Sequence, residues 1–167
     1  HCAEYCNTLG WFYDTFDHPQ RLKLLYVAAA YVNQAAWHQA NTGDLRPRER
    51  GLPAGADQRS ADNLLDCTEA AVLALDGPES VAWSMAFLDR DGDRRRLARR
   101  LARVASSIGN DPHNQEIALC LIEDYGKSAS PRRDRLLLAA AQHTARHRKY
   151  GDFLDTRRRF DAAMGAA

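Results

Sequence analysis

Hydrophobic residues recur every three or four positions along most of the chain, which is the spacing of an amphipathic α-helix. The pattern predicts helices over about 3–16 and 20–41, and further helices that begin near 61, 78, 94, 112, 132 and 152. Ser60, Pro78 and Asp93 stand where residues of these types favour a helix start. No segment alternates polar and apolar residues as a half-buried strand would. We therefore expect an all-α fold, an irregular bundle of about seven helices packed around a central apolar helix.

The segment 20–41 is the best candidate for that central helix. It is rich in alanine and apolar around most of its circumference, a composition typical of buried helices. Asn33 lies among its apolar positions, and a buried amide needs a partner. We expect Asn33 to be inside and hydrogen-bonded to a neighbouring helix. Alternatively, Tyr26, Asn33 and Trp37 line a small-molecule pocket, in which a few polar groups stand in apolar walls.

The longest irregular stretch, 42–59, is rich in glycine, proline and charge, which predicts a flexible loop. Neither side of it shows a self-sufficient core, so we expect one domain over 1–167 with this loop inside it. A chain of 167 residues is long enough to bury a core of its own. Because the chain begins at His1 rather than at a methionine, whether a segment precedes it stays open.

The composition is that of an ordinary globular protein, with 45% hydrophobic residues, 27% charged residues and a net charge of +1. No apolar run approaches the roughly 18 residues that a membrane span needs, so we expect no membrane partner. Four cysteines are too few for a disulfide framework, which favours reduced thiols and a cytoplasmic location. Cys2 and Cys6 fall on the apolar side of the first helix and are expected to be buried and unreactive. Trp11 falls on its polar side, which hints at a contact surface.

The candidate chemistry lies in two neighbouring helices near the C-terminus. His143 and His147 are one helical turn apart, and His113 and Glu116 lie on the preceding helix. A short reversal over 126–131 predicts that the two helices run antiparallel about a midpoint near residue 129. This pairing puts His113 and Glu116 level with His143 and His147. Three imidazoles and a carboxylate at one height can bind a divalent metal, namely zinc, iron or manganese.

This cluster leads to the first functional hypothesis, a metal-binding helical-bundle protein that is an enzyme acting on a small molecule. Asp124 and Tyr150 are its candidate acid–base residues. The reaction cannot be assigned from the sequence, and whether the protein is an enzyme stays open. The alternative for the cluster is a solvated polar face with two histidines hydrogen-bonded to carboxylates.

The second hypothesis is a non-catalytic interaction module. The segment 94–103 predicts a strongly basic amphipathic helix whose polar face would bind an acidic protein or nucleic acid. The near-zero net charge allows a second interpretation, in which nearby carboxylates neutralise this face within the protein. The arginines on the face are Arg95, Arg96, Arg99, Arg100 and Arg103.

Overall fold

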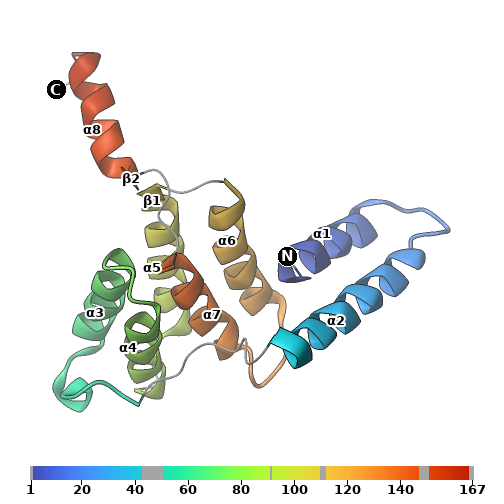
Figure 1. Ribbon diagram of the computed structural model, residues 1–167, viewed down its shortest axis with the longest axis horizontal. Helices are drawn as coiled ribbons and strands as arrows, with labels where there is room; N and C mark the ends of the chain where they lie inside the picture. Colours follow the sequence, from blue (N-terminus) through green and yellow to red (C-terminus); the bar gives the residue numbers. More distant parts are fainter. Residues whose placement is uncertain (1, 43–50, 91, 110–111, 147–150, 166–167) are drawn as a thin grey trace. The chain divides into compact units, whose positions relative to one another are not determined.

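The computed structural model describes residues 2–42, 51–90, 92–109, 112–146 and 151–165 (Figure 1). These residues form eight α-helices, one 3-10 helix and one antiparallel pair of two-residue strands. The expected all-α class is confirmed. None of the described helices is both long enough and apolar enough to cross a membrane.

The contacts between Cα atoms divide the chain into two compact units, 1–46 and 47–167. We call them unit 1 and unit 2. The division falls inside the segment 42–59, where the sequence analysis placed a loop within one domain. Part of that segment is ordered in unit 2, because it contains a short 3-10 helix, η1 (Ala56–Gln58), whose Ala56 is buried.

Unit 1 consists of two helices in contact, α1 (Cys2–Thr15) and α2 (Lys23–Thr42). Unit 2 holds η1 and all the other elements. Its helices are α3 (Ala61–Leu73), α4 (Gly77–Asp89), α5 (Arg94–Ser107), α6 (Pro112–Lys127), α7 (Asp134–Thr144) and α8 (Phe153–Ala163). Its strands are β1 (Ile108–Gly109) and β2 (Gly151–Asp152), which pair with Ile108 opposite Asp152 and Gly109 opposite Gly151.

Helix starts follow the capping residues that the sequence provides. The Ser60 hydroxyl accepts a hydrogen bond from the Asn63 amide at 3.2 Å at the start of α3. Asp93 accepts from the Arg95 amide at 2.9 Å at the start of α5. Each cap satisfies a backbone donor that has no partner within the helix. The predicted starts at 61, 78 and 94 are thus confirmed to within one residue.

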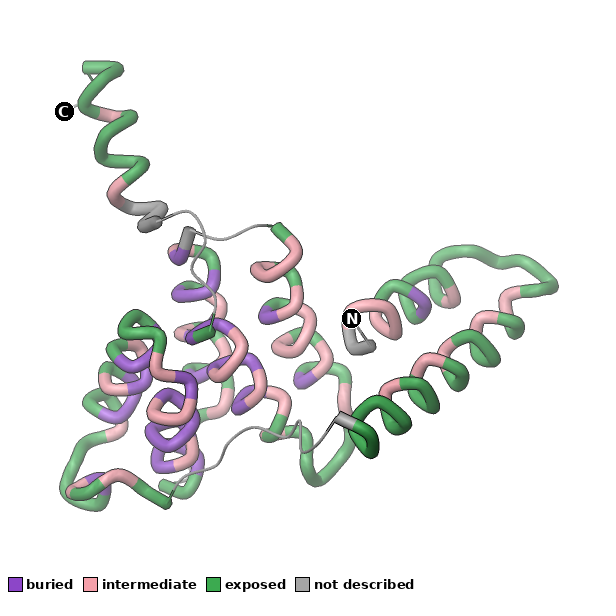
Figure 2. Tube along the Cα trace, viewed as in Figure 1, coloured by how far each residue is buried: buried purple, intermediate pink, exposed green. Residues whose placement is uncertain are grey.

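The core of unit 2 is centred on α4, which buries nine of its thirteen residues. It contacts α3 on one side and α7 on the other (Figures 1 and 2). Phe87 and Val81 are fully buried. The buried hydroxyls of Ser80 and Ser84 donate to helix carbonyls at 2.8 and 2.7 Å, so these small residues allow close packing without an unpaired polar group.

The prediction that the helix over 20–41 is central and most buried is wrong. None of residues 23–41 in α2 is buried, and Figure 2 shows the helix mostly in the exposed colour. Asn33, expected inside, is exposed, and Tyr26 and Trp37 are 78% and 64% exposed. Only one side of α2 is half-buried, where Tyr31 stacks on Tyr5 of α1 with ring centroids 4.2 Å apart. The composition shows that this helix needs an apolar partner, but one neighbouring helix covers only part of it.

The first helix also departs from expectation. Cys6 is half-buried rather than buried, and the side chain of Cys2 lies outside the described residues. Trp11 is exposed as expected, and it forms an edge-to-face pair with Phe12 with centroids 5.1 Å apart. Aromatic surface therefore remains uncovered on α1 as well as on α2.

Candidate functional site

The register of the helices α6 and α7 agrees with the sequence analysis. The Nε2 atom of His143 donates a hydrogen bond to the backbone carbonyl of Asn114, with 3.1 Å between the two atoms. Residues 114 and 143 are equally far from a midpoint next to residue 129. The antiparallel pairing predicted from the short reversal is therefore confirmed, and His143 lies level with the first turn of α6.

The predicted metal ligands are brought together only in part. Within the first turn of α6, ligand atoms of His113 and Glu116 lie within 4.8 Å of each other. Among the described residues, His143 does not come within that distance of both of them. His147 lies outside the described residues. Two adjacent ligands are fewer than the three or four that hold a zinc ion in proteins.

The expected acid–base residues do not join this group. Asp124 follows His113 by eleven residues on the same helix, which corresponds to about 16 Å along the axis. It is therefore too far away to exchange a proton with a ligand held at His113. Burial raises the pKa of Asp124, an effect that Lys127 opposes and Glu123 reinforces. Tyr150 lies outside the described residues.

The residues expected to line a small-molecule pocket lie on the exposed part of unit 1. A ligand site encloses most of its ligand in a concave surface. Tyr26, Asn33 and Trp37 are all exposed along α2, so they do not provide such an enclosure within unit 1.

The basic face of α5 is largely neutralised by carboxylates of α3. Arg96 pairs with Asp62, and Arg100 pairs with Asp66 at 2.9 Å. The remaining contacts go to Glu69, which lies 2.5 Å from Arg100 and 2.7 Å from Arg103. The hydrogen bond to Glu69 raises the pKa of Arg100 despite the opposing effect of burial. Of the five arginines expected to meet a partner, Arg95 and Arg99 remain exposed and have no ion pair among those observed.

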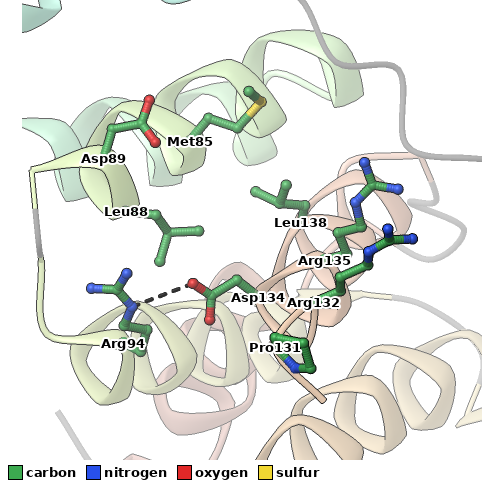
Figure 3. A pocket seen from close by; sticks show the side chains of 9 residues that line it. All are labelled: Met85, Leu88, Asp89, Arg94, Pro131, Arg132, Asp134, Arg135 and Leu138. Atoms are coloured by element: carbon green, nitrogen blue, oxygen red, sulfur yellow. Dashed lines mark hydrogen bonds and ion pairs between the residues drawn. The ribbon is translucent and has the colours of Figure 1, made fainter.

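A concave site that the sequence analysis missed lies in unit 2, where the end of α4, the start of α5 and the start of α7 meet (Figure 3). We call it the arginine cleft. Its volume is about 310 Å³. The lining side chains are Met85, Leu88, Asp89, Arg94, Pro131, Arg132, Asp134, Arg135 and Leu138.

The positions of the charged side chains in the arginine cleft are set by the helix starts that carry them. Arg94 is fixed at the start of α5, because its Nε lies 3.3 Å from Asp134 and its Nη1 donates to the Gly92 carbonyl at 3.1 Å. Arg132 and Arg135, three residues apart, extend from the start of α7 along another side of the cleft (Figure 3). With two aspartates among the lining residues, the three arginines leave one net positive charge.

The apolar part of the cleft comes from Met85, Leu88 and Leu138, and Figure 3 shows both leucines directed into it. Guanidinium groups beside an apolar wall can bind a molecule that has both an acidic group and a short hydrocarbon part.

One signal in the sequence points to this site. Arginines are placed unfavourably at the start of a helix, because the N-terminal end of the helix dipole is itself positive. Arg132, Arg133 and Arg135 nevertheless cluster around the start of α7. Basic residues at a helix start, against this preference, often mark a functional position.

Comparison with protein-family models, with curated proteins and with solved structures returned no match for this chain.

Proposed function

We propose that unit 2 binds a small acidic molecule in the arginine cleft. The observation that carries this proposal is that three arginines from two different helix starts line one concave site. They are Arg94, Arg132 and Arg135. A guanidinium group binds carboxylate or phosphate through two parallel hydrogen bonds, which makes arginine the preferred residue for such ligands.

The size and the walls of the cleft narrow the class of ligand. Its volume of about 310 Å³ is at the small end of the range for ligand pockets, which favours a metabolite-sized molecule over a peptide. Leu88 and Leu138 favour a ligand with a short apolar part. Asp134 holds Arg94 in place before any ligand arrives, so less conformational entropy is lost on binding.

Isothermal titration calorimetry with inorganic phosphate, butyrate and butyl phosphate tests the proposal. We expect butyl phosphate to bind most tightly, because it alone combines the doubly charged group with a hydrocarbon part. The double change Arg132→Ala and Arg135→Ala should weaken binding at least about tenfold, since each charge-assisted hydrogen bond contributes about 1.5–3 kcal/mol.

Arg99→Ala is the matched control, because it removes an exposed arginine of α5 that does not line the cleft. This variant should bind butyl phosphate as the unaltered protein does. Equal losses in the control and in the double variant would show that only the general positive charge matters. Absence of binding for all three probes would refute the assignment of the cleft.

A divalent metal site is the second candidate function, in line with a metal-dependent enzyme. The hydrogen bond from His143 Nε2 to the Asn114 carbonyl favours it, because metal-binding histidines usually donate one ring N–H to such an acceptor and bind the ion through the other nitrogen. His113 and Glu116, whose ligand atoms lie within 4.8 Å of each other, would supply two ligands for zinc, iron or manganese, and His143 would become the third only after its side chain moves closer to them. His143 follows Arg135 by eight residues, about 12 Å along α7, so the two candidate sites are separate.

Zinc titration of protein purified without a histidine tag tests this second candidate. His143→Ala should weaken zinc binding at least about tenfold, and binding should weaken as the pH falls below about 6.5, where imidazoles become protonated. His18→Ala is the control, because His18 belongs to unit 1. If the dissociation constant for zinc is about micromolar or higher, the histidines have only a structural role.

The interaction module with an acidic protein or nucleic acid is the least supported of these functions. It would depend on Arg95 and Arg99, because α3 already neutralises the other three arginines of the face.

A further inference from the structure

The side of α2 that faces away from α1 forms a continuous apolar surface. At 100° per residue, its members fall within one side of the helix, opposite to His38. Leu25 and Val32 are 55% and 56% exposed, and Tyr26 and Trp37 are exposed still further. We call this surface the α2 face and define it by Leu25, Tyr26, Ala29, Val32, Asn33 and Trp37.

Charge is almost absent from α2. Among its twenty residues only Lys23, the first one, is charged. A helix surrounded by water usually has charged residues on its wet side, whereas the centres of protein interfaces are poor in charge and rich in aromatic residues. An uncovered apolar surface of this kind marks an interaction site, and its neutrality argues against an acidic or a basic partner.

The sequence of the α2 face is complementary to itself. Ala29 and Trp37 lie four residues before and after Asn33, and Tyr26 and Ala40 lie seven residues before and after it. In an antiparallel pair of α2 helices centred on Asn33, each large ring therefore meets an alanine of the other copy. The Asn33 amide, which has both donors and an acceptor, meets its own counterpart. Because Asn33 is near the middle of α2, this arrangement pairs the whole length of the helix.

We propose that the α2 face is the contact between two copies of this chain, related by a twofold axis near Asn33. Such an axis requires the same surface on both copies, which the alternation of large and small residues around Asn33 provides. A polar asparagine within an apolar helix interface also fixes the register, since any shifted pairing would bury its amide without a partner. Unit 1 of one copy and unit 1 of the other would then form a group of four helices. This arrangement would cover the apolar sides of all four helices.

The exposed area is sufficient for a dimer. Aromatic side chains bury about 150–250 Å² each, so the exposed parts of Tyr26 and Trp37 offer roughly 300 Å² in each copy. Leu25 and Val32 are each more than half exposed, and together with the exposed Ala29, Asn33 and Ala36 they add a similar area. Two copies together would bury about 1,200 Å², which is at the lower end of specific protein interfaces.

Sedimentation equilibrium of the 167-residue chain over a range of concentrations tests the proposal. We expect a concentration-dependent dimer for the unaltered protein. Ala36→Arg places a charge in the middle of the α2 face and should raise the dimer dissociation constant at least about 100-fold, because a buried unpaired charge is costly. His38→Arg adds the same charge to the opposite side of α2 and should leave the dimer unchanged. Circular dichroism checks that both variants keep their helicity.

Cross-linking then tests the position of the axis. Asn33→Cys should give a disulfide between two copies on mild oxidation, with peptides joined through position 33, because the two side chains face each other. His38→Cys should not do so, because position 38 lies on the opposite side of α2, and the unaltered protein, treated in parallel, accounts for the native cysteines. A monomer at about 100 μM would overturn the proposal, because a dimer of this area should associate at such a concentration. A dimer that Ala36→Arg does not weaken, or equal cross-linking at positions 33 and 38, would also overturn it.

Discussion

The helices α2 and α4 are both rich in apolar residues, yet α4 buries nine of its thirteen residues and α2 buries none of residues 23–41. The difference lies in their neighbours within each unit. α4 contacts both α3 and α7, whereas α2 has only α1 beside it in unit 1. Apolar composition therefore indicates that the surface of a helix is covered by another part of the protein or by a partner. The number of surrounding helices determines whether the same unit can cover that surface.

The strongest test of this contrast compares two large aromatic residues. Phe87→Ala should lower the free energy of unfolding of unit 2 by about 3–5 kcal/mol, because it leaves a cavity in a fully packed core. Trp37→Ala removes a larger ring but should change the stability of unit 2 by less than about 0.5 kcal/mol, since this ring is exposed on α2. Hydrogen exchange of the α4 amides measures both effects within unit 2. Equal losses in the two variants would show that the stability of unit 2 depends on Trp37 as much as on its own core.

A second test compares two glycines. A Cβ atom at Gly92 would lie 2.5 Å from both the ring and the carbonyl oxygen of Phe87. Gly92→Ala should therefore destabilise unit 2 by about 1–3 kcal/mol, since the carbonyl cannot move away easily. Gly10→Ala is the counterpart in α1, where a Cβ atom would meet nothing within 4 Å. It should stabilise this helix by about 0.5–1 kcal/mol, because alanine loses less backbone entropy than glycine. Thermal unfolding followed by circular dichroism measures both changes, and a stabilising Gly92→Ala would contradict the close packing of unit 2.

The smallest expected effect concerns Asp124, whose pKa is raised by burial. The folded state then holds the Asp124 proton more strongly than the unfolded state does, so stability falls as the pH rises from the ordinary value of about 3.8 through the raised pKa. Asp124→Asn removes this penalty and should increase stability at neutral pH by no more than about 0.5 kcal/mol. Below about pH 3.8 the unaltered protein and the variant should be equally stable. Urea unfolding at several pH values measures the difference, and a variant that loses stability at neutral pH would show that the carboxylate itself stabilises α6.

Local features of the fold could be predicted from the sequence, because their causes are local. Ser60 and Asp93 cap helices with their own side chains, and the short reversal before α7 sets the pairing that joins His143 to Asn114. The surroundings of α2 could not be predicted, since its apolar pattern is the same for a helix covered within its own unit and for one covered by another copy.

The arginine cleft could not be predicted from spacing for a related reason. Arg94 and Arg132 are 38 residues apart in the sequence and line the same cleft only after α5 has packed against α7. Of the predicted metal ligands, His113 and Glu116 lie close together because they are within one helical turn, where sequence distance is a good guide to distance in space. Asp124 was grouped with them on the basis of helix face alone, and the rise along α6 separates it from His113.

The ion pairs between α3 and α5 have a consequence for the kinetics of folding. Asp62 with Arg96, Asp66 with Arg100 and Glu69 with Arg103 are each separated by 34 residues, so α3 and α5 run in the same direction side by side. None of these pairs can form until α4 has reversed the chain between them, so we expect them to form late in folding. Interactions that form after the transition state slow unfolding without accelerating folding. These charges should therefore govern the lifetime of folded unit 2, and added salt should shorten that lifetime while the rate of folding stays the same.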